Sequence, residues 1–199
     1  MRRTLALALS LSLVAAGTAS AQESTTRGFN VGLHLGGASI TVEDGDRHGG
    51  GGGGLWIGYG FNRTVQLFVQ LDGSEIDVTD SDVQGKWTMG HGDLGVRFHF
   101  ANSLRSWVPY LQAAITGRVV GVDNPTINGS SEPDAALVGG GLTLGSGMLV
   151  YFSETFAMDI QADWTGGTFT QLEYDNVTIK NLDLDAQSAR FNVGVSWWP

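Results

Sequence analysis

The sequence contains no cysteine and only four prolines among its 199 residues. The absence of cysteine excludes a disulfide-stabilised scaffold, a thiol enzyme and a thiolate metal site. Basic residues are also scarce: eleven Lys and Arg stand against twenty Asp and Glu, which gives a formal net charge of −9. A chain with this charge offers no positive patch to a phosphate backbone, so we expect no nucleic-acid partner.

The first residues are typical of a secretory signal peptide. Arg2 and Arg3 precede an apolar run at residues 5–16, and Ala19-Ser20-Ala21 supplies the small residues of a cleavage site. The apolar run is shorter than the roughly 20 residues that a spanning helix needs. We therefore expect residues 1–21 to be removed on export from a bacterial cytoplasm, and residues 22–199 to form one domain.

Glycine, in contrast, is abundant. The thirty glycines lie mostly within alternating apolar runs, which indicates strands that are crowded or strongly curved. The exception is the uninterrupted run at residues 49–54. It lacks the Lys-Ser/Thr pair and the helix of a phosphate-binding loop, so we interpret it as a flexible junction between a loop and a strand.

Alternation of apolar and polar residues is clearest at residues 55–72, LWIGYGFNRTVQLFVQLD, on both sides of a turn at Arg63-Thr64. The same period of two recurs at residues 29–36, 93–100, 110–118, 136–152, 156–165 and 189–197. The uncharged segment 136–152 could be mistaken for a spanning helix, but its five glycines would cost a helix roughly 0.8–1 kcal/mol each. The pattern therefore predicts eight strands of about ten residues.

The connections between these strands alternate in length. Those after the second, fourth and sixth strands are short, whereas those after the first, third, fifth and seventh are long, polar and acidic. This arrangement is typical of an all-β fold, an eight-stranded antiparallel up-and-down transmembrane β-barrel, with both termini on the short-turn side and the long loops outside the cell.

A soluble barrel of the lipocalin type is the rival architecture, because it has the same alternation with its apolar face inside. Three features favour the membrane barrel. The expected lumen face is rich in small residues, Lys and Arg are too few for a soluble exterior, and aromatic residues gather at the short-turn end of the apolar face. These aromatic residues are Phe61, Phe100, Phe156 and Trp197.

Three short stretches carry a family resemblance: Pro109-Tyr110-Leu111, Gly140-Gly141-Leu142 and the closing residues 191–198. With these stretches and the strand pattern, the chain resembles the OmpA/OmpX-like family of eight-stranded outer-membrane barrels. It does not extend to a peptidoglycan-binding domain, so no anchoring role is carried over. It implies a monomer in the cell outer membrane, in contact with lipid and lipopolysaccharide, delivered by periplasmic chaperones and inserted by the barrel-assembly machinery. The implied assembly signal consists of Phe191, Val193, Gly194, Val195, Trp197 and Trp198, with Pro199 as an unusual last residue.

Several charged residues occupy the alternate strand positions whose side chains are expected to face the lumen. They are Arg97, Arg118, Arg190, Asp72, Asp93, Asp159 and Asp163. Eight strands leave room for little beyond side chains, so we expect these three cations and four anions to pair and to close the lumen. The alternative is that they line a wet pore.

The sequence offers few other candidates for catalytic or metal-binding residues. His34, His91 and His99 have no metal-ligand spacing, and we interpret them as lumen or rim hydrogen-bonding groups. Asp80-Ser81-Asp82 and the acidic residues at 43–46 lack calcium-loop spacing and are interpreted as solvated loops. Because the outer rim is acidic, divalent cations are nevertheless expected to bridge it to lipopolysaccharide phosphates. No catalytic residue, cofactor or tightly bound metal is predicted.

The sequence therefore favours a non-enzymatic outer-membrane barrel with a structural or interaction role, supporting the envelope and exposing acidic loops. Two alternatives stay open. One is a narrow channel for ions or small solutes. The other is an outer-membrane lipid-modifying enzyme, although the local His and Ser motifs of such enzymes are not matched.

Overall fold

The computed structural model describes residues 26–43, 45–78, 83–100, 106–127, 130–131, 133–175 and 177–199. The predicted signal peptide, residues 1–21, lies outside this part of the chain. The long strands are β1 (Gly28–Val42), β2 (His48–Gly60), β3 (Val65–Asp77), β4 (Val83–His99), β5 (Trp107–Ile127), β7 (Ala135–Tyr151), β8 (Phe156–Tyr174) and β9 (Val177–Trp197). β6 (Ser130–Ser131) pairs only with the end of β5. No helix in the described residues is long and apolar enough to cross a membrane.

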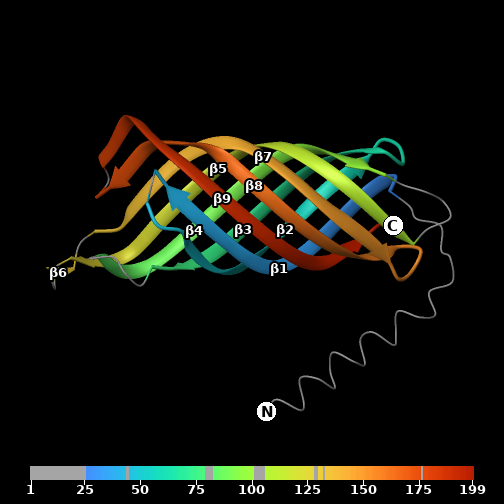
Figure 1. Ribbon diagram of the computed structural model, residues 1–199, viewed down its shortest axis with the longest axis horizontal. Helices are drawn as coiled ribbons and strands as arrows, with labels where there is room; N and C mark the ends of the chain where they lie inside the picture. Colours follow the sequence, from blue (N-terminus) through green and yellow to red (C-terminus); the bar gives the residue numbers. More distant parts are fainter. Residues whose placement is uncertain are drawn as a thin grey trace, which may run out of the picture.

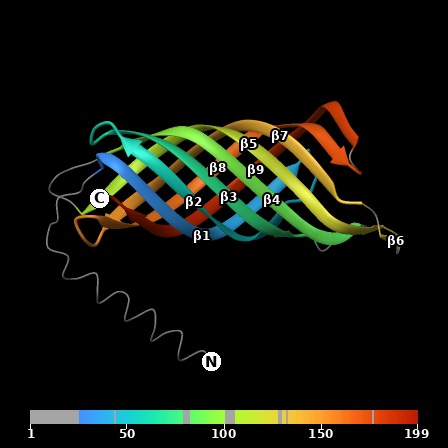
Figure 2. The same ribbon diagram turned by 180° about the vertical axis from the view of Figure 1, so that it is seen from behind.

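The eight long strands close into an antiparallel ring. They follow the order β4-β3-β2-β1-β9-β8-β7-β5, and pairing of β4 with β5 completes the circle. The first and last strands meet from Val31↔Trp197 to Val42↔Ala186. Figures 1 and 2 show the resulting cylinder from opposite sides, with the C-terminus at the end that carries the short turns. The predicted up-and-down barrel is confirmed.

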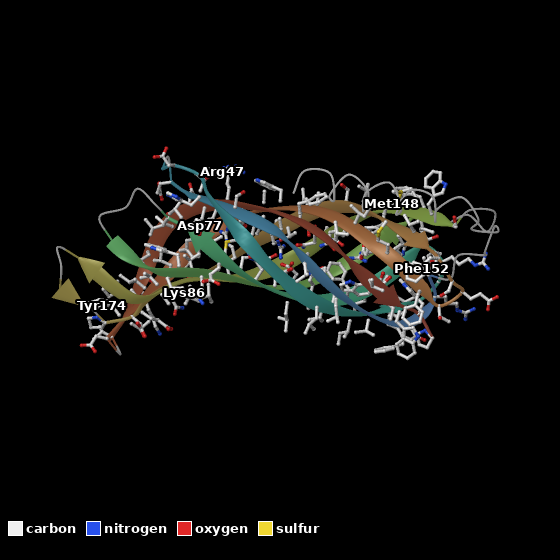
Figure 3. The ribbon with its side chains drawn as sticks, turned by 90° about the horizontal axis from the view of Figure 1, so that it is seen from below. Arg47, Asp77, Lys86, Met148, Phe152 and Tyr174 are labelled. Carbon is white, nitrogen blue, oxygen red and sulfur yellow. The ribbon has the colours of Figure 1, made fainter. Side chains whose placement is uncertain are left out.

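The two ends of the barrel differ, and we call them the turn end and the far end. At the turn end, residues 61–64 and 152–155 connect strands, and Figure 3 shows Phe152 there. The predicted aromatic residues Phe61, Phe100, Phe156 and Trp197 are exposed at this end, and Phe152 is exposed beside them. The far end carries Arg47, Asp77, Lys86 and Tyr174 (Figure 3).

The strands are longer than predicted, at 13 to 21 residues. They run through most of the segments expected to be long acidic loops, and only two residues separate Tyr174 of β8 from Val177 of β9. A strand of 17 residues rises roughly 40 Å along a barrel whose strands tilt by about 40°. This exceeds the roughly 25 Å height of a membrane-facing apolar band, so the far end extends beyond the band.

The glycine run at residues 49–54 is part of β2, and the prediction of a flexible junction is wrong. The run pairs with both neighbouring strands, from Gly49↔Ser39 to Gly54↔His34 and from Gly49↔Asp77 to Gly54↔Asp72. Gly50, Gly52 and Gly54 point inward, where a Cβ would approach β3 closer than 3.0 Å. Close approach of the two backbones therefore explains these glycines.

Outward-facing side chains near the turn end form a continuous apolar band. It includes Leu33, Leu35, Ile57, Leu71, Leu94, Ile115, Leu142, Leu144 and Phe191, all of them exposed. Side chains of the opposite parity are buried and mostly polar, among them Gln66, Gln70, Arg97 and Asp159. A soluble barrel would have the reverse distribution, so the membrane-facing architecture is the correct one of the two rivals.

Beyond the apolar band, the polarity of the wall reverses. On β3 the outward residues become Gly73, Glu75 and Asp77, whereas Ile76 points inward and is buried. On β9 the outward residues become Asp183, Asp185 and Gln187, whereas Ala186 is buried. The far end therefore has the polarity of a water-facing barrel with its own hydrophobic core.

Candidate functional site

The lumen, meaning the interior of the barrel, is filled in three layers. The lower apolar cluster at the turn end consists of Trp56, Val108, Tyr110, Leu149, Tyr151, Ala157 and Trp198. The upper apolar cluster at the far end consists of Ala38, Ile40, Ile76, Met89, Val120, Phe169 and Ala186. Between them lies a polar tier of inward charged and polar side chains, which is the candidate site.

Arg190 of β9 is the centre of the upper half of the polar tier. Its Nη1 lies 2.5 Å from Asp72 Oδ2 on β3, and its Nη2 lies 2.8 Å from Asp93 Oδ2 on β4. The second oxygen of Asp72 lies 2.6 Å from His34 Nε2. Gly54 leaves room for this contact, since a Cβ there would lie 2.7 Å from His34 Nε2. These charge-assisted hydrogen bonds tie four strands together inside the lumen.

Arg97 of β4 is the centre of the lower half. Its Nε donates to Gln112 Oε1 at 2.9 Å, and its Nη1 lies 3.4 Å from Asp159 Oδ2. The guanidinium carbon also lies 4.0 Å from the centre of the Tyr110 ring and 4.9 Å from that of Trp56. Arg97 therefore links the polar tier to the lower apolar cluster through both charge and ring contacts.

The expected charge pairing does not extend to Asp163 or Arg118. Asp163 accepts hydrogen bonds from the amide groups of Gln112, at 2.6 Å, and Gln161. Arg118 forms no ion pair with any described residue and donates from both terminal nitrogens to the Ala186 carbonyl at 3.2 Å. The ladder neighbours of Arg118 are His91 and Gly139, so its register brings no carboxylate beside it.

Several neutral side chains of the polar tier were not among the predicted site residues. Three hydroxyls form a chain around the wall, from Thr116 to Thr143 at 2.6 Å and from Thr143 to Thr165 at 2.7 Å. Thr116 also donates to Asp93 Oδ1 at 2.6 Å. Their inward parity was visible in the sequence, but hydroxyls on adjacent strands are recognised as a set only when the register is known.

Two of the three histidines form the hydrogen bonds that were predicted, and His99 does not. His34 bonds Asp72, and His91 Nε2 lies 2.9 Å from Ser188 Oγ. His99 packs edge-on against Tyr110 and Trp198, with ring centres 5.7 and 6.0 Å apart, and neither ring nitrogen has a partner among the described residues.

The predicted assembly-signal residues divide between two faces. Phe191, Val193, Val195 and Trp197 point outward and are exposed. Gly194 and Trp198 have the opposite parity and point into the lumen. Trp198 is 1% exposed, its backbone nitrogen donates to the Thr155 carbonyl at 2.7 Å, and its ring packs against Trp56 at 6.3 Å. The last aromatic side chain therefore packs inside the lumen at the turn end.

No group of His, Cys, Asp or Glu within the described residues is arranged to hold a metal ion. Asp80-Ser81-Asp82 lies outside those residues. Glu43 instead extends the seam between β1 and β9: its backbone nitrogen donates to the Asp185 carbonyl at 2.7 Å, and its Oε1 accepts from the Asp185 nitrogen at 2.8 Å.

Comparisons with known proteins agree with this geometry. Residues 6–197 match the family described as outer membrane protein beta-barrel domain. No curated protein matches the sequence. Among solved structures, Neisserial surface protein A is 16% identical with a TM-score of 0.62, over 85% of this chain and 96% of that one. OprG from Pseudomonas aeruginosa is 10% identical with a TM-score of 0.60, over 86% and 96%. Ail of Yersinia pestis is 13% identical with a TM-score of 0.55, over 86% and 99%. At these identities the shared property is the fold.

Proposed function

Because the chain belongs to the outer membrane protein β-barrel family, we propose that it is a sealed, non-enzymatic scaffold of that membrane. An outer-membrane location follows from family membership. In this proposal the turn end faces the periplasm, and the far end stands outside the cell as a rigid surface for interaction with other molecules. The lumen stabilises the scaffold and conducts nothing.

The observation that carries the proposal is the position of the polar tier between two apolar clusters. Arg97, Asp93 and Arg190 are at most 4% exposed, so the charges have no broad contact with water. A hydrated ion entering from either end would first have to displace packed side chains such as Trp198 or Phe169. It would then have to break the ion pairs between buried side chains, which costs free energy because the separated charges would be left without partners.

The polar tier also supports a structural role. Arg190 reaches β3 and β4, which are not its neighbours in the ring, and Arg97 reaches from β4 to β8. Such contacts across the lumen stiffen the wall in addition to the ladder of backbone hydrogen bonds. A stiff wall suits a protein that supports an envelope.

The lack of access for a substrate argues against catalysis in the lumen. His91 and Ser188, 2.9 Å apart, have the spacing of a base and a nucleophile. Both are at least nine-tenths buried, and they lie beneath the upper apolar cluster, where a lipid substrate has no path to them. We therefore assign this pair a packing role.

The remaining partners belong to the outer faces. In our proposal the apolar band contacts lipid, and the outward residues of β9 are read by the barrel-assembly machinery during insertion. These outward residues are Phe191, Val193, Val195 and Trp197. Lipopolysaccharide, with divalent cations as bridges, would meet the acidic wall above the band.

A solute-release assay tests the sealed lumen. Purified protein is refolded into liposomes that contain a small dye, and dye release is compared with that from empty liposomes and from liposomes carrying a general porin. We expect release at the rate of the empty liposomes. Release that grows in proportion to the amount of folded protein would overturn the proposal.

A further inference from the structure

The wall of the far end is uneven in height. β8 and β9 continue as a hairpin beyond the end of β1, whose last partner on β9 is Ala186 (Figure 1). Residues 177–184 of β9 therefore pair, among the described residues, with β8 alone. This hairpin is one of the parts of the wall that project at the far end (Figure 1).

Two rows of apolar side chains cross this projecting wall. Residues directly opposite one another in an antiparallel ladder lie on one face, so the register defines each row. The first row is Val120–Leu137–Leu172–Ile179, and the second is Val122–Ala135–Tyr174–Val177. Both rows share the inward face of the wall, since Val120 and Leu137 belong to the upper apolar cluster or pack against it.

Each row passes from buried to exposed. Val120 and Val122 on β5 are 7% exposed, whereas Ile179 and Val177 on β9 are 49% and 59% exposed. Ile179 and Val177 are exposed because β1, the other neighbour of β9, ends before it reaches the level of these two residues. The rows thus extend the hydrophobic core of the far end into solvent as an apolar face, which we call the hairpin face.

The other side of the same hairpin is polar. Its cross-strand pairs are Glu173↔Thr178 and Gln171↔Lys180. When a strand pair is apolar on one side and polar on the other, its apolar side normally packs against other apolar side chains. Exposed apolar surface of this kind on a water-facing element marks an interaction site.

Among the residues that the structure describes, Ile179 and Val177 stay 49% and 59% exposed, so the hairpin face is left largely uncovered. The residues of the far-end connections that lie outside the described part are Asp44, Thr79, Asp80, Ser81, Asp82, Asn128, Gly129, Glu132 and Asn176. All are polar or glycine, and we therefore look to another molecule for the cover.

The charge around the hairpin face indicates which molecule fits. The described acidic residues of the far end are Glu43, Asp46, Glu75, Asp77, Asp134, Glu173, Asp175, Asp183 and Asp185, against Arg47, Lys86 and Lys180. A second copy of this chain would bring the same negative charge to the contact, and an anionic lipid surface would likewise be repelled wherever no divalent cation bridges the two.

We propose that the hairpin face docks a cationic amphipathic segment of another protein. Its apolar side chains cover Ile179 and Val177, and its Lys and Arg side chains meet the acidic rim. This inference rests on the proposed function in one respect, namely that the far end stands outside the membrane.

The segment lies on the face of the hairpin and does not extend its edge. Lys180 belongs to that edge strand, and the ladder is irregular between Lys180 and Leu184, where Asn181 has a φ of 65°. A lysine and a bulge at an edge strand oppose the addition of a further strand. The apolar face has no such protection.

A peptide-binding experiment tests the proposal. The probe is a short fluorescent peptide of alternating Leu and Lys, added to the whole protein in nanodiscs of phosphatidylcholine, with empty nanodiscs as background. The variants are Ile179→Asn and Val177→Asn on the hairpin face, and the matched control is Thr178→Asn on the opposite face of the same strand. Heat-modifiable gel migration verifies that each variant is folded.

We expect the wild-type protein and Thr178→Asn to bind the peptide, and each hairpin-face variant to bind at least about tenfold more weakly. Binding of the wild type should weaken as salt rises from about 50 to about 500 mM, because the charges are exposed. A matching peptide of Leu and Glu should not bind. Equal binding by all variants, no binding by the wild type, or self-association that Ile179→Asn abolishes would overturn the proposal. The dye-release assay tests the proposed sealed lumen independently, so failure of peptide binding and failure of the sealed lumen can be distinguished.

Discussion

Arg190 Nη1 lies 2.5 Å from Asp72 Oδ2, and this ion pair joins strands that are not neighbours in the ring. β1 and β2 stand between β9 and β3. Both side chains are at most 5% exposed. The pair therefore connects separate parts of the wall through the lumen, which the backbone ladder cannot do.

Replacing Arg190 with Ala should destabilise the barrel strongly. The change leaves both Asp72 and Asp93 without their cation, and breaking a buried ion pair from one side costs about 3–5 kcal/mol. Urea-induced unfolding of the protein in lipid vesicles, followed by tryptophan fluorescence, measures the loss in unfolding free energy.

Arg118→Met is the matched control, because Arg118 is equally buried but has no carboxylate partner among the described residues. We expect a much smaller loss from this change, since no anion is left unpaired. If both substitutions cost the same, the stability of the barrel does not depend on the Arg190 ion pairs.

Substitutions of Trp198 and Trp197 should distinguish a side chain that packs in the lumen from one on the outward face. Trp198→Ala removes a ring that is 1% exposed from the lower apolar cluster, and a large-to-small change of this kind costs about 3–5 kcal/mol. Trp197 is 41% exposed on the outward face, so Trp197→Ala should cost less in purified, refolded protein. Unfolding in vesicles measures both, and equal losses would contradict the position of Trp198 in the lumen.

Two glycines should respond in opposite ways to alanine. Gly54→Ala places a Cβ 2.7 Å from His34 Nε2 and 2.9 Å from Asp72 Oδ1, and this crowding should cost at least about 1 kcal/mol. Gly73 points outward with nothing within 4 Å of a new Cβ, so Gly73→Ala should be neutral or stabilising by up to about 1 kcal/mol. A thermal shift of the same sign for both would show that inward crowding is unimportant.

The sequence was most informative where one face is lipid-facing. Strict alternation in segments such as residues 55–62 and 65–71 fixes which side chains face lipid, and the lengths of the connections fix the strand order. The halves of the strands at the far end were missed for a physical reason. There the outward positions are glycine or acidic, as at Gly73, Glu75 and Asp77, so the local composition is that of a loop.

Within the lumen, parity identified the inward residues but not their partners. Arg190 meets Asp72 and Asp93 because the ring brings β9 opposite β3 and β4, and that arrangement depends on register around the whole barrel. Arg118 has the same parity, yet its register neighbours are His91 and Gly139. Trp198 was grouped with the assembly signal, although its parity, opposite to that of Trp197, already indicated an inward side chain.

The boundary between the apolar band and the far end can be mapped with single cysteines, since the natural chain has none. Asp77→Cys on β3 and Gln187→Cys on β9 should react with an impermeant maleimide added to whole cells. Leu71→Cys and Val193→Cys, on the same two strands within the band, should react only after the protein is denatured. Labelling of all four in intact cells would place the membrane elsewhere.

The most direct test of a sealed lumen is electrical recording from the purified wild-type protein in a planar lipid bilayer, beside its Arg97→Ala and Arg190→Ala variants. We predict no steady conductance from the wild type at either polarity. The variants, in which a carboxylate loses its partner, should open a measurable leak. A steady ohmic conductance from the wild type that neither substitution changes would contradict the sealed lumen and identify the protein as a pore.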